Sequence, residues 1–331
     1  MVIVVKYLIT GGAGFIGSNF IKYMLNKYPN DSFVCLDLLT YASSLDSLEE
    51  VINKSNFKFV HGDICDQELV DNLFKEEVFD YVVHFAAESH VDRSFIYPDL
   101  FYKTNVEGTK VLLAASKKYN VKRFHQVSTD EVYGELELTD NFSFNEESPL
   151  KPTTPYSKSK AMADELVLTY FNEYGLDVTI SRSTNNFGNY QHPEKLIPKV
   201  VKMALNNEKI TVYGDGSNVR DWMYVLDHCN AVDLILHQGK KGEIYNVGAN
   251  QELANIEVIK KILLLLNIGE DNISYVDGRI YDDKRYCLDC GKIKRELNWN
   301  IESNFNESFD NTVAWFKENL NWIKMILTKN Y

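Results

Sequence analysis

The chain has 331 residues, of which 45% are hydrophobic and 25% carry a charge, and its formal net charge at pH 7 is −12. This size and composition suit one large or two closely packed globular domains and exclude a small disulfide scaffold. The acidic balance argues against nucleic acid or an anionic membrane as a partner, so a local group of cations must hold any anionic ligand.

The amino-terminal segment Met1–Ile9 is mostly apolar and leads directly into a glycine-rich loop. It lacks a basic segment and a small-residue cleavage site, so we expect a first buried strand rather than a signal peptide. The longest apolar runs, such as Ile262–Leu266, are far shorter than the roughly 18 residues that cross a bilayer, so no membrane span is expected. Five scattered cysteines indicate a reducing, cytoplasmic setting, and the lone CxxC at Cys287–Cys290 predicts no metal site.

Apolar runs of strand length recur through the first part of the chain, at Tyr7–Thr10, Phe33–Asp37, Lys58–Val60, Tyr81–Phe85, Arg123–Val127 and Val178–Ser181. The segments between them have helical length and mixed polarity, at Ser18–Lys27, Gln67–Lys75, Asn105–Tyr119 and Ser157–Tyr174. This alternation predicts an α/β fold, a Rossmann-type doubly wound parallel sheet. We expect residues 1–186 to form this domain, with a soft boundary.

After residue 186 the elements become shorter and turns more frequent, as at Gly214-Asp215-Gly216. Helices are expected near Ile256–Leu266 and Phe309–Leu320, and residues 187–331 are predicted to form mainly a smaller, substrate-binding C-terminal lobe. Strands such as Tyr245–Val247 are expected to return to the first domain.

The segment Gly11-Gly12-Ala13-Gly14-Phe15-Ile16-Gly17 follows the first expected strand and opens a helix, which is the context of a dinucleotide fingerprint. Its glycines permit a tight turn and a close approach to a pyrophosphate, whose charge lies at the helix N-terminus. Asp37 follows Gly17 by twenty residues, at the end of the second strand. A carboxylate there binds the adenosine ribose hydroxyls and repels a 2′-phosphate, so NAD is favoured over NADP.

Two further strand ends are placed to line the adenine and ribose pocket. Asp63-Ile64 follows the third strand, and Phe85-Ala86-Ala87 follows the fourth. Close packing is an equally good explanation for the small residues, and Asp63 is also suited to cap a helix.

Tyr156 and Lys160 lie four residues apart at the start of an expected helix, hence on one face of it. A phenol has an ordinary pKa near 10. A neighbouring ammonium and a bound nicotinium would lower this pKa and let Tyr156 act as a base near neutral pH. The pair lies downstream of Ser128-Thr129 at the end of the fifth strand, as a hydroxyl-assisted dehydrogenase requires.

Asp130 and Glu131 directly follow that strand-end Ser-Thr pair. Simple oxidation does not need two adjacent carboxylates, since a tyrosine suffices. They are needed if a proton leaves carbon while hydroxide departs. The alternative is a solvated turn pair, and the position after the strand favours the catalytic interpretation.

Together these motifs resemble the dTDP-glucose 4,6-dehydratases, a family within the extended short-chain dehydrogenases/reductases. The resemblance runs from about Lys6 to Trp315 and rests on the fingerprint, the Tyr156/Lys160 pair, His84–Ser94, Thr129–Gly134, Pro193–Pro198 and Arg220–Trp222. It implies an NAD-dependent lyase that converts dTDP-glucose to dTDP-4-keto-6-deoxyglucose and water. It also implies a nucleotide-diphosphate hexose as the small-molecule partner.

The resemblance implies a division of labour among five catalytic residues. Tyr156 would take the 4-hydroxyl proton while hydride passes from C4 to NAD, and Thr129 would hydrogen-bond the developing 4-oxygen. Glu131 would remove the C5 proton, and Asp130 would protonate the departing C6 hydroxyl. Lys160 would bind the nicotinamide ribose and tune the tyrosine. Because the hydride returns to C6, NAD is expected to stay bound through turnover.

The resemblance also implies two sets of binding residues. For NAD these are Gly11, Gly14, Phe15, Ile16, Gly17, Asp37, Thr40, Asp63, Ile64, Phe85, Ala86, Ala87, Thr104, Tyr156, Lys160 and Asn186. For the substrate they are Glu88, Ser89, Asn185, Lys195, Leu196, Tyr213, Arg220, Asn255, Arg279 and Tyr286, with Arg285 as a further expected diphosphate ligand.

The chain departs from the family pattern in two places. Leu38 stands where the family commonly has a lysine near the adenosine, and residues 280–282 lack the family's Pro-Gly-His step. The choice between dTDP and UDP is therefore open. The enzyme alternatives are a UDP-glucose 4,6-dehydratase and a nucleotide-sugar 4-epimerase or decarboxylase; a non-catalytic NAD-sensing protein would be expected to lose Tyr156, Lys160 or the carboxylates.

The expected assembly is a homodimer. The helices at Leu100–Tyr119 and Ser157–Tyr174 either pack only on their own sheet or also pair with a second subunit. No nucleic acid or membrane is expected as a partner.

Overall fold

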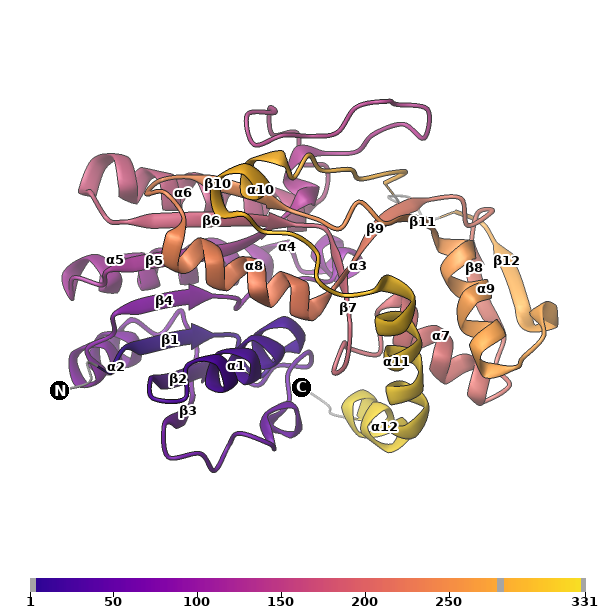
Figure 1. The fold of residues 1–331 in the computed structure, drawn as a ribbon, viewed down its shortest axis with the longest axis horizontal. Coiled ribbons are helices and arrows are strands. Elements are labelled where there is room, and N and C mark those ends of the chain that lie inside the picture. The colour runs from indigo at the N-terminus through magenta and orange to yellow at the C-terminus, as the bar shows by residue number, and fades with distance from the viewer. Residues whose placement is uncertain (1–3, 279–282, 329–331) are drawn as a thin grey trace.

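Seven apolar segments pair in parallel to form the central sheet of the computed structural model, which describes residues 4–278 and 283–328 (Figure 1). In spatial order they are β10 (Ile244–Val247), β6 (Val178–Ser183), β5 (Arg123–Thr129), β4 (Tyr81–His84), β1 (Lys6–Thr10), β2 (Ser32–Asp37) and β3 (Phe57–His61). The chain order reverses between β1 and β4, which is the Rossmann arrangement. The predicted fold class is confirmed.

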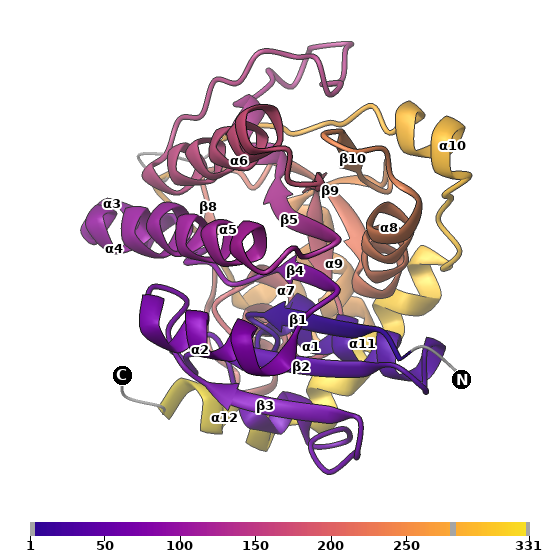
Figure 2. The same cartoon turned by 90° about the vertical axis from the view of Figure 1, so that its left-hand side faces the viewer.

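Alternate residues of the inner strands enter two separate cores, as the period of a strand requires. Tyr7 and Ile9 of β1 pack under α1 (Phe15–Lys27) and α8 (Val225–Gln238). Leu8 packs on the opposite face, which is covered by α2 (Gln67–Glu77), α5 (Thr109–Lys118) and α6 (Pro155–Tyr174). Figure 2 shows α2 and α5 on one side of the strands and α8 on the other.

Two elements begin differently from the sequence-based expectation. The first strand starts at Lys6, and Val4 before it is 54% exposed, so the apolar start of the chain is not wholly a buried strand. The helix predicted over Asn105–Tyr119 is a π-helical turn, η2 (Lys103–Gly108), followed by α5. Short elements precede or connect these helices, namely η1 (Leu45–Leu48), α3 (Val91–Ile96), α4 (Pro98–Tyr102) and η3 (Asp130–Tyr133).

A second lobe has its own core, which includes Trp222, Ile262 and Phe316. Its strands are β7 (Asn185–Phe187), β9 (Val219–Tyr224) and β11 (Glu252–Ala254) in one sheet and β8 (Ile210–Tyr213) with β12 (Ile273–Val276) in another. Its helical elements are α7 (Leu196–Leu205), α9 (Asn255–Leu266), η4 (Glu270–Asn272), α11 (Phe305–Glu318) and α12 (Leu320–Thr328). Residues beyond 186 also supply α8, β10 and α10 (Gly291–Leu297), which pack with the first sheet.

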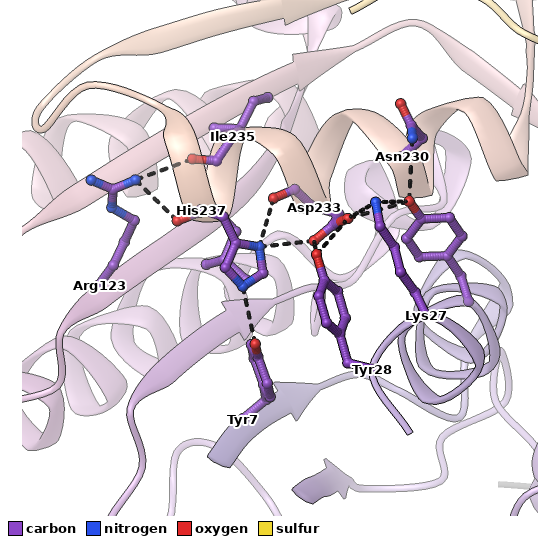
Figure 3. Close-up of polar contacts among 10 residues, drawn as sticks. Tyr7, Lys27, Tyr28, Arg123, Asn230, Asp233, Ile235 and His237 are labelled. Carbon is purple, nitrogen blue, oxygen red and sulfur yellow. Dashed lines mark hydrogen bonds and ion pairs between the residues drawn. The ribbon is translucent and has the colours of Figure 1, made fainter. Parts of the chain in front are cut away.

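At the amino-terminal edge of the large sheet, a buried carboxylate joins α1 to α8 (Figure 3). Asp233, whose side chain is 1% exposed, accepts hydrogen bonds from Lys27 Nζ at 2.6 Å and the Tyr28 hydroxyl at 3.0 Å. His237 Nδ1 lies 2.8 Å from Asp233 Oδ1, and His237 Nε2 lies 3.0 Å from the Tyr7 hydroxyl. Burial acts to raise the pKa of Asp233, but the hydrogen bonds from His237 and Lys27 outweigh it and hold the pKa below its ordinary value.

The opposite, carboxyl-terminal edge of the sheet faces the second lobe (Figure 1). In open parallel sheets the loops at this edge, near the point where the chain order reverses, form the ligand crevice. Within the described residues no helix combines the length and the apolar character needed to span a bilayer.

Candidate active site

A cavity of about 380 Å³ lies at the carboxyl ends of β1 to β6, against the start of the second lobe. All of the predicted catalytic residues line it, namely Thr129, Asp130, Glu131, Tyr156 and Lys160. All of the predicted cofactor residues also line it, which adds Gly11, Gly14, Phe15, Ile16, Gly17, Asp37, Thr40, Asp63, Ile64, Phe85, Ala86, Ala87, Thr104 and Asn186. The fold thus brings these distant segments to one place.

The glycine loop leaves space that a side chain would fill. Gly11 has a φ of +68°, and a Cβ there would lie 2.5 Å from the backbone nitrogen of Ala86. A Cβ on Gly17 would lie 2.4 Å from the carbonyl oxygen of Gly11. The helix α1 begins at Phe15, so its free N–H groups are positioned beside the cavity. A loop of this shape at a helix N-terminus fits a dinucleotide pyrophosphate.

Asp37 is held at the cavity wall by three hydrogen bonds. Its carboxylate accepts from the backbone N–H of Ala13 at 2.9 Å and of Leu39 at 2.8 Å, and from the Ser43 hydroxyl at 3.0 Å. Burial raises the pKa of this carboxyl, and the three donors oppose the rise. Asp37 therefore fixes the glycine loop against the loop after β2, besides facing the cavity where the ribose is expected.

Helix α6 presents the tyrosine and lysine near its first turns. Thr154 caps the helix by accepting from the backbone N–H of Ser157 at 3.0 Å. Lys160 Nζ donates to the carbonyl oxygen of Val127 at 2.8 Å, and burial lowers the pKa of Lys160 to about 8 although Asp164 opposes the fall. The ammonium is therefore fixed at the end of β5.

In the protein without a ligand the pKa of Tyr156 is raised, whereas the expectation of a lowered pKa included a bound nicotinium. Burial is the largest cause, the charge of Glu131 is the second, and a hydrogen bond with Thr129 opposes them. In the protein by itself, burial and the adjacent carboxylates outweigh any help from Lys160. The cation needed to lower this pKa must come from a ligand of the cavity.

Asp130 of the carboxylate pair is buried, and Glu131 is half-buried and lines the cavity. Asp130 and Glu131 open η3, where Thr129 accepts from the backbone N–H of Glu131 at 3.3 Å and donates to Asp130 Oδ1 at 3.2 Å. Asp130 is 3% exposed, and its Oδ2 is buried with no hydrogen-bond partner among the described residues. A buried oxygen without a partner is costly, and such atoms often mark sites of function. The solvated-turn alternative does not hold.

The two carboxyls differ in their affinity for a proton. Burial, the charge of Glu131 and that of Asp221 raise the pKa of Asp130 well above its ordinary range. Burial and Asp283 raise the pKa of Glu131 to about 7, while Arg220 and Lys195 oppose the rise. Asp130 is thus suited to give a proton at neutral pH and Glu131 to take one.

The predicted substrate residues divide into two groups. Glu88, Ser89, Asn185 and Lys195 line the cavity. Leu196, Tyr213, Arg220, Asn255 and Tyr286 do not, and Arg279 lies outside the described residues. Arg220 nevertheless acts on both carboxyls, and its guanidinium lies 5.0 Å from the ring centroid of Tyr286. These two side chains therefore flank the reaction centre from the second lobe.

The expected contact of Arg285 with a diphosphate stays a prediction, and the guanidinium is engaged within the protein. Its Nε and Nη2 donate to the carboxylate of Glu252 at 2.5 and 2.9 Å, and its Nη1 donates to the carbonyl oxygen of Asp140 at 2.9 Å. The planar fork is already engaged by a bidentate partner. Arg285 anchors its own segment to β11.

Several cavity residues were missed by the sequence analysis, namely Ser43, Lys103, Ser183, Thr184, Gln191, His192 and Glu194. Glu194 lies inside the Pro193–Pro198 motif, so the motif contained a signal for it. Gln191 donates to the carbonyl oxygen of Asn186 at 2.8 Å, a contact made through the loop after β7. No local sequence pattern distinguishes Gln191 or Ser43.

Comparisons with known proteins find relatives over nearly the whole chain. The family model described as GDP-mannose 4,6 dehydratase matches residues 8–312. The low-salt glycan biosynthesis protein Agl12 of Haloferax volcanii is 48% identical, over 93% of this chain and 97% of that protein. A dTDP-glucose 4,6-dehydratase of Shigella flexneri is 41% identical, over 98% and 96%. The structure of DesIV, a dTDP-glucose 4,6-dehydratase from Streptomyces venezuelae with NAD and TYD bound, is 44% identical with a TM-score of 0.94, over 97% and 100%.

Proposed function

This chain belongs to the GDP-mannose 4,6-dehydratase family, and we propose that it is an NAD-dependent dTDP-glucose 4,6-dehydratase that forms dTDP-4-keto-6-deoxyglucose and water. The observation that carries the proposal is the carboxylate pair Asp130 and Glu131 in the same cavity as Tyr156 and Lys160. Oxidation alone needs only the second pair. The first pair adds the acid and the base that a water elimination requires.

The cavity residues fit NAD. The glycine loop and the start of α1 would hold the pyrophosphate, Asp37 would bind the adenosine ribose, and Lys160 would bind the nicotinamide ribose. When bound, NAD supplies a hydride acceptor at C4 of the sugar, a hydride donor at C6 and a positive charge beside the phenol of Tyr156. That charge is of the sign needed to lower the raised pKa of Tyr156.

The first step removes the proton of the 4-hydroxyl group. Tyr156 accepts this proton, and Thr129 is placed beside it to donate a hydrogen bond to the oxygen that becomes the ketone. Lys160, fixed by the carbonyl oxygen of Val127, holds its ammonium on the same helical face.

The second step is the elimination of water across C5 and C6. The 4-ketone acidifies the C5 hydrogen, and Glu131, with a pKa of about 7, accepts it. Asp130, whose pKa burial and the charge of Glu131 raise well above its ordinary range, delivers a proton to the departing 6-hydroxyl group. One carboxyl is therefore neutral and the other is available as a base in the same turn of chain.

A nucleotide-sugar 4-epimerase is the second candidate, because it needs Tyr156 and Lys160 only. The enclosure of Asp130 argues against it, since an epimerase has no use for a buried proton donor at this position. A decarboxylase can carry the glutamate, so Asp130 is again the discriminating residue.

We infer that dTDP-glucose is preferred to UDP-glucose, which the similarity to dTDP-glucose 4,6-dehydratases supports. The altered step at residues 280–282 lies outside the described residues. The test is to incubate the protein separately with dTDP-glucose, UDP-glucose, CDP-glucose and GDP-mannose and to measure the mass of each product. Loss of one water from dTDP-glucose supports the dehydration, and a greater loss from dTDP-glucose than from UDP-glucose supports the preference. An unchanged mass with every donor contradicts both.

The division of the chain into an NAD-binding part (1–186) and a mainly substrate-binding part (187–331) stays a prediction, and so does the homodimer. Exposed apolar side chains on α3, α4 and α6 and at the junction of α3 with α4 support a subunit contact there, namely Phe95, Ile96, Tyr97, Leu100, Tyr102 and Met162. Analytical ultracentrifugation measures the assembly directly. A reducing, cytoplasmic setting is inferred from the five cysteines, none of which is paired.

A further inference from the structure

A hydrogen-bonded network of buried polar side chains lies behind the cavity, and none of its members lines the cavity. It consists of Asp164 on α6, Arg182 on β6, Tyr133 on η3 and Asn246 on β10. Each is at most 2% exposed. Groups of this kind are expensive to bury, so their placement calls for a specific reason.

The hydrogen bonds of this network connect its members without a break. Arg182 Nε donates to Asp164 Oδ2 at 2.9 Å, and Arg182 Nη1 donates to the Tyr133 hydroxyl at 3.0 Å. The Tyr133 hydroxyl in turn donates to Asn246 Oδ1 at 2.8 Å. The guanidinium also lies 4.9 Å from the centroid of the Tyr133 ring. A single arginine is thus fixed at both ends.

Two members of this network, Asp164 and Tyr133, lie on the elements that carry the two halves of the reaction centre. Asp164 follows Lys160 by four residues on α6, so the two side chains share a face of the helix. Tyr133 follows Glu131 by two residues in the short η3 helix. Arg182 therefore ties the element that carries the oxidation pair to the element that carries the carboxylate pair.

Asp164 also balances charge around Lys160. One of its oxygens binds Arg182, and the other, Oδ1, is buried with no hydrogen-bond partner among the described residues. The groups that face Lys160 from other elements are the Val127 carbonyl oxygen on β5 and His84 on β4, whose pKa burial lowers to about 3. Neither brings a negative charge. Tyr156, on the same helix, is protonated in the protein by itself.

We propose that Asp164 is a positioning residue of the reaction, whose carboxylate keeps the Lys160 ammonium charged and, through Arg182 and Tyr133, sets the distance between α6 and η3. This inference rests on the proposed function, because it assigns the lysine and the carboxylates their part in dehydration. The competing explanation is that the Asp164–Arg182 pair only fastens α6 to the sheet.

The two explanations differ in the titration of Lys160. Protein labelled with ¹³C at the lysine Cε positions reports each ammonium by NMR, and the Lys160 signal is identified by its loss in Lys160→Met. We expect its midpoint near 8 in the wild type. In Asp164→Asn it should move to lower pH by about one unit or more, as expected on loss of an adjacent opposite charge. The falling limb of the kcat/KM profile for dTDP-glucose should move with it.

Asp164→Glu keeps the charge and should restore both midpoints to near the wild-type values. Asp164→Asn combined with Arg182→Leu removes both buried charges, so it avoids an unpaired guanidinium if the single variant folds poorly. The acid shift should persist in it. Asp177→Asn is the matched control, because Asp177 pairs with Arg123 at 2.9 Å at the opposite edge of the same sheet.

A Lys160 midpoint and a kcat/KM profile that stay unchanged in both Asp164→Asn variants would overturn the inference and leave the pair as a fastener. The same result would follow if Asp177→Asn shifted the midpoint equally. Because the NMR titration needs no turnover, it stands even if dTDP-glucose proves not to be the substrate. Failure of the proposed function would appear separately, as a wild-type protein that leaves dTDP-glucose unchanged.

Discussion

Two buried aspartates at opposite edges of the sheet show how partners decide what a carboxylate does. Asp233 and Asp130 are both at most 3% exposed. Asp233 has donors on both oxygens and a lowered pKa, whereas Asp130 has one oxygen without a partner and a raised pKa. Both side chains are buried, which raises the pKa of a carboxyl. Only at Asp233 do hydrogen-bond donors outweigh burial and lower the pKa (Figure 3).

The difference separates stability from chemistry. A carboxylate with every oxygen engaged holds α1, α8 and β1 together as a charged centre. A carboxyl left unsatisfied destabilises the fold but retains a proton that it can deliver to a substrate. Such trade-offs between stability and activity are common at active sites.

The largest effect is expected at the reaction centre. Asp130→Asn keeps the shape of the side chain and removes its proton, so dehydration of dTDP-glucose should fall by about 10²- to 10⁴-fold. The free energy of unfolding at pH 7 should stay equal or rise, because a neutral amide replaces a carboxyl whose ionisation is opposed by burial. Steady-state rates and urea denaturation measure the two quantities. A large loss of both activity and stability in Asp130→Asn would contradict the view that Asp130 serves the reaction rather than the stability of the fold.

The converse is expected for Asp233→Asn. It removes the charge that Lys27 and His237 share, and it should lower the free energy of unfolding by about 3 kcal/mol, at the low end for a broken buried pair because Lys27 is 40% exposed. The activity of the folded protein should be unchanged. Asp71→Asn, which breaks an exposed pair with Lys118, is the control and should change neither property measurably.

The contributions of Asp233 and Glu131 to the free energy of unfolding should change with pH in opposite directions. Asp233 has a lowered pKa in the folded state, so its contribution to stability is present above its unfolded pKa and is lost as pH falls through the folded value. Glu131 has a pKa raised to about 7, so the folded state loses stability as pH rises from about 4.3 through 7. Glu131→Gln should therefore exceed the wild type in stability above pH 7 by about 1–3 kcal/mol, with the difference vanishing below about pH 4.

The same titration of Glu131 should appear in catalysis. Because the base must be ionised, kcat/KM for dTDP-glucose is expected to rise with pH on a limb centred near 7. A profile that is flat between pH 6 and 8 would argue against Glu131 as the base.

The smallest effect is expected at Arg285, which is not among the residues that line the cavity. Its guanidinium is engaged by Glu252, so Arg285→Gln should change the KM for dTDP-glucose by less than about tenfold. Arg220→Gln should raise KM more, since Arg220 flanks the carboxylates. Equal effects of the two substitutions on KM would support Arg285 as a diphosphate ligand.

The sequence predicted the parts of the site that depend on short contiguous motifs. The glycine loop, Asp37 at the end of β2 and the Tyr156/Lys160 spacing each follow from local geometry, and all lie at the cavity as expected. The pairing of Arg285 with Glu252 was not predicted, because Glu252 is 33 residues away and on another strand. The raised pKa of Tyr156 in the protein without a ligand was not predicted, since it depends on burial and on Glu131 across the site.

As with the site, the sequence predicted only part of the fold. The doubly wound parallel sheet followed from the alternating apolar runs, and the strand expected at Tyr7–Thr10 is β1 (Lys6–Thr10). The π-helical turn η2 was not predicted. The network of Asp164, Arg182 and Tyr133 joins three separated segments, so no spacing rule reveals it.

The most direct test of dehydration by an acid and a base follows single turnovers of dTDP-glucose in deuterated water, with product mass and bound reduced nicotinamide as readouts. Wild type should lose water and take up deuterium. Asp130→Asn should oxidise C4 and exchange the C5 hydrogen but retain the 6-hydroxyl group, whereas Glu131→Gln should oxidise C4 with little exchange. If both variants eliminate water at the wild-type rate, the pair is not the acid and base, and a nucleotide-sugar epimerase becomes the better explanation of the cavity.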